Sequence, residues 1–201
     1  MHVDYYGSLN SPWTYLGSAR IEALCAKHGA SLKFWPVDFG LIFPASGGLP
    51  LPKRSPQRQA YRMMELRRWR EATGLPLTLE PKHFPFPEAM LAQAVIALRE
   101  TPSPLGGDAP AIRLAHRIMK ALWAEDRDPV ADFATLAAEC GQDGAALLAL
   151  AADPKWAAMR QADSQAALDR GVFGAPSFVI EGEIFWGQDR LDFVERKLAP
   201  Q

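Results

Sequence analysis

The sequence predicts an α/β fold in which a β-α-β unit and a β-β-α unit enclose a large all-helical block. Three observations lead to this prediction. Two short, aromatic-rich segments, residues 2–7 and 31–37, flank a helix-like segment near the N-terminus. Near the C-terminus, two apolar runs split by residues 181–183 indicate a β-hairpin. Between these ends the pattern is mostly helical, with breaks rich in Gly and Pro.

The N-terminal unit begins with a strand over residues 2–7 and continues with a helix over residues 12–28. Ser11 is a suitable N-cap, Pro12 suits the first helical position, and Gly29 suits the C-terminal end. Residues 31–37 alternate in polarity and form the second predicted strand. A strand, helix and strand within about 30 residues predict a parallel pair with a right-handed crossover.

The middle of the chain predicts a long loop over residues 39–55, followed by a helix over residues 56–73 that Ser55-Pro56 opens. A break at residues 101–110 separates two later helices, and Asp108 is a candidate cap for the second of them. The further predicted helices span residues 88–100, 110–124, 130–140, 143–151 and 154–170.

The C-terminal unit consists of the hairpin within residues 176–187 and an amphipathic helix within residues 188–198. Removing the helical block leaves the element order of a thioredoxin-like fold, with the block inserted between the second and third strands. We therefore expect a discontinuous thioredoxin-like domain, residues 1–45 and 171–201, and a helical insertion domain, residues 46–170.

Composition narrows the class of protein. The chain has 201 residues, a formal net charge of −1 and 48% hydrophobic residues, enough for a proper core. This charge balance gives no reason to expect a nucleic-acid or membrane partner. No apolar run approaches the roughly 18 residues that span a bilayer, and no secretory signal pattern precedes the first strand. We expect a cytoplasmic protein.

Cysteine and histidine usage gives no sign of a disulfide or a metal centre. The two cysteines, Cys25 and Cys140, lie far apart in sequence and match no redox or metal spacing. We expect both to be buried, inert thiols in a reducing compartment. The four histidines are scattered and form no ligand motif, so we expect no metal.

The turn between the first strand and the first helix has an unusual composition. Thioredoxin-like chains commonly carry Cys-x-x-Cys there, whereas this chain has Ser11, Pro12, Trp13 and Thr14. Two hydroxyl side chains cannot form a disulfide, so a disulfide oxidoreductase is disfavoured. A hydroxyl donor at a helix N-terminus would instead favour an anionic sulfur brought by another molecule.

Three segments resemble the 2-hydroxychromene-2-carboxylate isomerase family, which is itself similar to kappa-class glutathione transferases and DsbA-type oxidoreductases. They are DYYGSLNSPWTYLG, LPLPKRSPQRQAYRMMELRRW and RGVFGAPSFVIEGEIFWGQDRLDFVERKL. The resemblance covers nearly the whole chain, including element order. It implies a thioredoxin-like fold and glutathione as the cofactor.

The resemblance also implies roles for individual residues. Ser11 would be the catalytic residue that contacts the glutathione sulfur, although the same serine could act only as a helix cap. Ala175-Pro176 would hold a cis bond and present the Ala175 backbone to the cysteinyl part of glutathione. Gln188 and Asp189 would bind its γ-glutamyl end, with capping of the last helix by Asp189 as the alternative.

Arg58 would bind the glycyl carboxylate of glutathione, because kappa-class enzymes place a lysine near the start of this helix. Lys53 and Arg54 are nearby alternatives for the same role.

Aromatic residues could line the acceptor pocket or pack in the core. The candidates are Trp13, Phe39, Phe43, Phe84 and Phe86. Family members that act on the chromene carboxylate can carry a lysine near position 43. Phe43 at this position argues against that substrate.

The leading function is a glutathione-dependent isomerase of aromatic-compound catabolism, which acts by reversible thiol addition, bond rotation and elimination. A kappa-like transferase that conjugates electrophiles is the alternative, and a non-catalytic thiol-binding protein is a third interpretation. The partner would be a small aromatic carboxylate or electrophile. Kappa-like relatives are dimers, so the resemblance also implies a homodimer.

Overall fold

A computed structural model describes residues 1–102, 104 and 106–199. Its sheet contains β1 (His2–Gly7), β2 (Ser31–Pro36), β3 (Ser177–Ile180) and β4 (Glu183–Trp186), in the order β2-β1-β3-β4. β1 and β2 are parallel, whereas β3 runs antiparallel to both β1 and β4. This mixed sheet confirms the expected thioredoxin-like fold.

The helical elements agree with the prediction in order and differ from it in detail. Residues 103 and 105 of the predicted break, and residues 200–201 of the expected thioredoxin-like domain, lie outside the described residues. The α-helices are α1 (Pro12–His28), α2 (Phe39–Ser46), α3 (Pro56–Thr73), α4 (Ala89–Glu100), α5 (Asp108–Trp123), α6 (Phe133–Glu139), α7 (Gly144–Ala151), α8 (Pro154–Asp169) and α9 (Leu191–Leu198). Two 3-10 helices, η1 (Leu51–Lys53) and η2 (Gln188–Arg190), complete the set found in these residues.

The prediction of one continuous loop over residues 39–55 is wrong, because α2 and η1 lie within it. Asp38 caps α2 by accepting a 2.8 Å hydrogen bond from the N–H of Gly40, and Gly47 ends the helix with a φ of 76°. Phe39 and Ile42 are buried in a cluster that includes Ala167 of α8. Tertiary packing therefore stabilises a helix that its Gly and Pro content disfavours.

Two expected caps are also absent. Asp108 lies in the first turn of α5, and the N-cap position belongs to Gly107. Asp189 lies within η2, and its carboxylate pairs with Arg190 at 2.9 Å. The expected caps Ser11 and Ser55 are confirmed, since their hydroxyl groups accept hydrogen bonds from Thr14 and Arg58, respectively.

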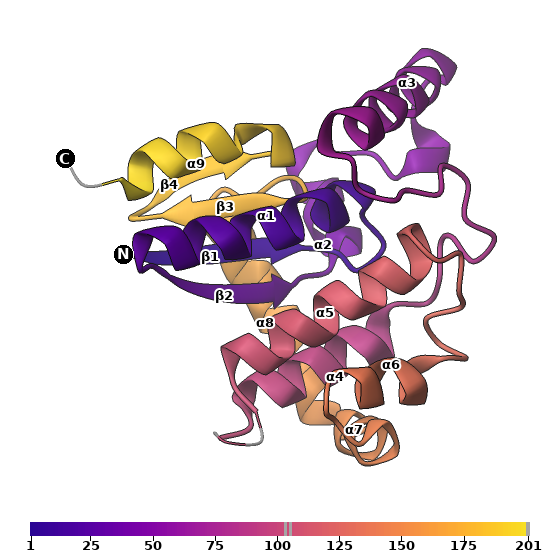
Figure 1. Ribbon diagram of the computed structural model, residues 1–201, viewed down its shortest axis with the longest axis vertical. Coiled ribbons are helices and arrows are strands. Elements are labelled where there is room, and N and C mark those ends of the chain that lie inside the picture. The colour runs from indigo at the N-terminus through magenta and orange to yellow at the C-terminus, as the bar shows by residue number, and fades with distance from the viewer. Residues whose placement is uncertain (103, 105, 200–201) are drawn as a thin grey trace.

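The arrangement of layers places the N-terminal end of α1 at the side of the sheet nearest α3 (Figure 1). In Figure 1, α1 and α9 lie over one face of the sheet, while α8 passes behind the other. Helices α4 to α7 form the helical block below the sheet, and α3 stands apart from that block.

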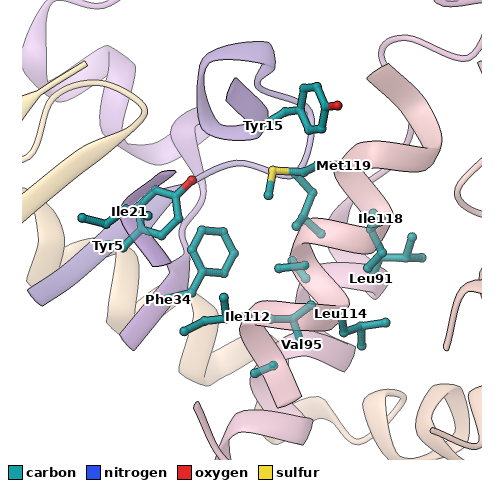
Figure 2. Packing of buried hydrophobic residues seen from close by; sticks show 14 of the residues in the cluster. Tyr5, Tyr15, Ile21, Phe34, Leu91, Val95, Ile112, Leu114, Ile118 and Met119 are labelled. Carbon is teal, nitrogen blue, oxygen red and sulfur yellow. The ribbon is translucent and has the colours of Figure 1, made fainter. Parts of the chain in front are cut away.

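The main core joins the sheet to the helical block. The Tyr5 ring lies 4.9 Å from the Phe34 ring and 5.0 Å from the Phe178 ring. Figure 2 shows Tyr5 and Phe34 on one side of this core and residues of α4 and α5, such as Val95 and Leu114, on the other. The insertion and the sheet thus share one continuous apolar interior. Among the described helices, none combines the length and apolarity needed to cross a membrane.

Candidate active site

The loop between β1 and α1 carries the first part of the site. Gly7 ends β1 where an added Cβ would lie 2.5 Å from the Thr14 methyl group, so a larger residue would not fit without movement. Ser11 then adopts an extended backbone, and its Oγ accepts a 3.2 Å hydrogen bond from the N–H of Thr14. The turn therefore brings a serine hydroxyl to the positive end of α1.

This helix end retains unused hydrogen-bond donors. The Ser11 hydroxyl accepts from Thr14, and among the described residues it donates to no protein acceptor. The N–H of Trp13, in the first turn of α1, likewise has no protein partner in the described part of the chain. Two adjacent donors at a helix N-terminus suit an anionic atom.

A carboxylate from the start of α4 fixes the same loop. Glu88 accepts a 2.7 Å bond from the Ser8 hydroxyl and a 3.0 Å bond from the Asn10 N–H. Arg160 of α8 donates to the other oxygen of Glu88 at 2.8 Å. The Asn10 side chain also donates to the Phe86 carbonyl at 2.9 Å and accepts from its N–H at 3.1 Å. Sequence reasoning missed this network, and no local signal joins residues 78 positions apart.

A cavity of about 540 Å³ opens in front of this loop. Its wall combines the turn before α1, the segment from α2 to α3, the residues at 84–85 and the segment before β3. The lining residues are Ser8, Asn10, Ser11, Pro12, Trp13, Phe39, Phe43, Ser46, Gly47, Gly48, Leu49, Pro50, Leu51, Pro52, Arg54, Arg58, Arg62, Phe84, Pro85, Phe173, Gly174, Ala175 and Trp186.

The cavity thus brings together most of the predicted site residues. Ser11, Trp13, Phe43, Arg58, Phe84 and Ala175 all contribute to the wall, as do the alternatives Phe39 and Arg54. Phe86 is buried in the main core, and Lys53 lies outside the cavity wall. The wall also includes Phe173 and Trp186, whose rings pack 4.7 Å apart. Sequence reasoning missed this pair, although both residues lie within a segment that carries the family resemblance.

Three arginines form a basic side of the cavity. Arg58 and Arg62 lie four residues apart on α3 and so share one face of the helix, and Arg54, which precedes the helix, lines the same cavity. Burial, together with the neighbouring Arg58, lowers the pKa of Arg54. Burial and Arg54 lower the pKa of Arg62 to about 10. None of the three pairs with a carboxylate among the described residues, so this side of the cavity carries uncompensated positive charge.

The residues predicted for the cysteinyl part and the γ-glutamyl end of glutathione lie at different places. The Ala175-Pro176 bond is cis, as expected, and Ala175 forms part of the cavity wall. Gln188 is buried outside that wall, where Arg20 donates to its backbone carbonyl at 3.2 Å and also to its side chain. Asp189 also lies outside the wall.

The two thiols take no part in the cavity. Cys25 and Cys140 are buried and unpaired. Burial, with Glu22 contributing, raises the pKa of the Cys25 thiol to about 11. Within the described ranges, no three His, Cys, Asp or Glu residues gather closely enough to hold a metal ion. The chemistry of the cavity therefore depends on hydroxyl, amide, guanidinium and aromatic groups.

Comparisons with known proteins agree with this architecture. Residues 2–199 match the sequence model of the DSBA-like thioredoxin domain. The chain is 29% identical to a 2-hydroxychromene-2-carboxylate isomerase of Sphingobium xenophagum over 199 residues, which cover 98% of this chain and 97% of the relative. It is 25% identical to the isomerase of the same name from Pseudomonas putida over 203 residues, 99% of this chain and 95% of that one.

Solved structures show the same fold. The structure of a 2-hydroxychromene-2-carboxylate isomerase superposes with a TM-score of 0.84 at 24% identity, covering 98% of this chain and 94% of the other. The cytosolic disulfide reductase DsbM of Pseudomonas aeruginosa, in a structure with GSH, gives a TM-score of 0.64 at 22% identity, with coverage of 98% and 99%.

Proposed function

The chain belongs to the DSBA-like thioredoxin domain family, and from this membership and the chemistry of its cavity we propose a glutathione-dependent isomerase of the 2-hydroxychromene-2-carboxylate type. The observation that carries the proposal is a pair of donors, the Ser11 hydroxyl and the Trp13 N–H, that have no acceptor among the described residues and belong to the wall of a cavity with three arginines. The names of the curated relatives supply the reaction.

The residues of the cavity fit glutathione in charge and hydrogen bonding. Glutathione has a sulfur that is reactive as an anion, and it has two carboxylates. The cavity offers hydrogen-bond donors for the sulfur and guanidinium groups for a carboxylate. Arg58 would hold the glycyl carboxylate, because it is exposed at the start of α3 and free of acidic partners among the described residues.

The backbone of Ala175 would hold the central residue of the tripeptide. Within the described residues, neither its N–H nor its carbonyl takes part in a protein hydrogen bond, and only Pro176 separates the residue from the start of β3. A free backbone beside a sheet can pair with an extended peptide in the manner of an added strand.

Gln188 and Asp189 would hold the γ-glutamyl end beyond the cavity wall. The N–H groups of both residues donate no hydrogen bond within the described part of the chain, so they can receive a carboxylate. The Asp189 carboxylate would receive the ammonium group, in competition with its pair to Arg190. The Gln188 side chain is already engaged by Arg20, which leaves its backbone for this role.

The protein would act by stabilising the negative charge on the sulfur of glutathione and by positioning the substrate beside it. Bound glutathione supplies a thiolate that adds reversibly to a conjugated double bond and thereby allows that bond to rotate. Ser11 and the N–H of Trp13 would stabilise the anionic sulfur, and Ser11 itself forms no covalent bond. The aromatic wall, including Phe43 and Phe84, would exclude water and hold a flat substrate.

Purified protein with 2-hydroxychromene-2-carboxylate tests the proposal. We expect the absorbance spectrum to change toward that of trans-o-hydroxybenzylidenepyruvate only when glutathione is present, with no net loss of thiol. An unchanged spectrum with and without glutathione would refute the chromene assignment.

A kappa-like transferase is the second candidate, and the apolar side chain of Phe43 in the cavity favours it. Chlorodinitrobenzene distinguishes the two activities, because transfer consumes one thiol for each product formed. The third candidate is a non-catalytic thiol-binding protein. It would bind a thiol, as measured by calorimetry, and turn over neither substrate.

The domain division, the oligomeric state and the cellular location remain proposals. They are a thioredoxin-like domain of residues 1–45 and 171–201 with an insertion domain of residues 46–170, a homodimer, and a cytoplasmic location. Sedimentation of the purified chain would measure the oligomeric state directly.

A further inference from the structure

Arg62 is a half-buried cation that forms no ion pair within the part of the chain that the structure describes. Among the described residues its polar contact is a 3.7 Å approach of Nη1 to the sulfur of Met63. The nearby carboxylate of Glu65 is held by Arg68 at 2.5 Å. Withdrawing a guanidinium from water without an anionic partner is unfavourable. Its pKa, lowered to about 10 by burial and by Arg54, still leaves it charged near neutral pH. The position therefore favours an anion.

Two aromatic rings pack against Arg62. Its guanidinium carbon lies 5.5 Å from the centre of the Phe84 ring and 5.8 Å from that of Trp123. The two rings pack against each other at 5.0 Å, and Phe84 also forms part of the cavity wall. Because Arg62 and Phe84 line the same cavity, an anion bound by Arg62 can also contact the Phe84 ring, which favours a flat aromatic body.

Arg62 also differs in depth from the arginine proposed for glutathione. Arg58 is exposed, whereas Arg62, one helical turn further along α3, is half-buried. Residues four apart on a helix are separated by about 6 Å along its axis. This spacing accommodates two carboxylates from two different molecules on the same side of the cavity.

We propose that Arg62 is a specificity-determining residue that binds the carboxylate of the acceptor substrate while Phe84 packs against its aromatic ring. This inference rests on the proposed function and extends it to the choice of substrate. The site then selects planar aryl carboxylates over neutral compounds of the same shape. A site for neutral electrophiles would gain nothing from an unpaired, half-buried guanidinium.

Binding of trans-cinnamate and its neutral counterpart cinnamamide, measured by calorimetry without glutathione, tests the inference. We expect the wild-type protein to bind cinnamate more tightly by on the order of tenfold or more. Arg62→Met should abolish this preference. Arg67→Met removes the same charge from an exposed position of α3 outside the cavity wall, and it should retain the preference.

A replacement variant keeps the inference testable. Arg62→Gln, which retains polarity without charge, replaces Arg62→Met if that variant does not fold, as judged by circular dichroism. An equal preference in wild type and the Arg62 variant, or no preference in wild type, would overturn the inference. Because this experiment uses neither glutathione nor turnover, a missing isomerase activity would count against the proposed function and leave the Arg62 result intact.

Discussion

The backbone N–H of Asn10 donates a 3.0 Å hydrogen bond to a carboxylate oxygen of Glu88, which joins the loop before α1 to the start of α4. The same oxygen accepts from the Ser8 hydroxyl, and Arg160 holds the other oxygen. One largely buried carboxylate thus receives donors from the first loop and from α8. The position of Ser11, one residue after Asn10, depends on a contact with the helical insertion.

Glu88→Gln should destabilise the protein. The amide keeps the shape of the side chain, but it provides one acceptor oxygen in place of two and removes the charge that pairs with Arg160 at 2.8 Å, which leaves Arg160 a 4.0 Å approach to Asp38. We expect the free energy of unfolding in urea to fall by about 2 kcal/mol. Glu71→Gln, at an exposed position of α3, is the matched control and should change it by less than about 0.5 kcal/mol. Equal stabilities of the two variants would contradict the role given to Glu88.

Ser11→Ala should affect both stability and activity, whereas Ser55→Ala should affect stability alone. Each serine accepts a hydrogen bond from the backbone three residues later, and only Ser11 forms part of the cavity wall. We expect each variant to lose about 1 kcal/mol of stability through the lost cap. Isomerase activity should fall on the order of 100-fold in Ser11→Ala only. If both variants keep full activity, Ser11 is a cap and nothing more.

Arg58→Met should weaken glutathione binding on the order of tenfold, because one charge-assisted contact to the glycyl carboxylate is lost. Glutathione and its glycyl monoethyl ester, compared by calorimetry, identify the contact. The wild-type protein should prefer the free acid, and the variant should bind both equally. A variant that still discriminates would transfer the role to Arg54, the other candidate in the cavity wall.

His116 should make the stability sensitive to mild acid. Burial, with Lys120 and Arg117 contributing, lowers the pKa of this histidine, whose Nδ1 lies 2.8 Å from the Ser18 hydroxyl. The unfolded chain therefore takes up the proton first as the pH falls. The contribution to stability is complete above about pH 6.5 and is lost as the pH falls through the folded-state pKa.

Urea unfolding at about pH 7.5 and 5.5 measures this effect. His116→Gln should lose less stability between the two conditions than the wild-type protein. Identical losses in wild type and His116→Gln would refute the prediction.

Local signals were sufficient for much of the fold. Ser11, Pro12 and Gly29 define both ends of α1 because capping depends on neighbouring residues. The helix α2 was not predicted, because its stability comes from burying Phe39 and Ile42 in a cluster with residues of α8 and β3. Asp38 was the available signal, since it caps the helix through Gly40.

The candidate site likewise contains some residues that the sequence predicts and others that only the tertiary structure identifies. Ser11 and Ala175 could be found because they occupy motif positions next to strands. Arg62 could not be distinguished from its neighbours Arg67 and Arg68 by sequence, because only the packing against Phe84 and Trp123 sets it apart. The contacts of Glu88 depend equally on tertiary structure.

The turn at Ser11 and Thr14 does not respond to the redox state of its surroundings. A turn built from two hydroxyl groups stores no electrons, and the two thiols of the chain are buried away from the cavity. The turn therefore has a single oxidation state, whatever the ratio of thiols to disulfides around it. A protein of this kind needs no reductase to restore it between turnovers.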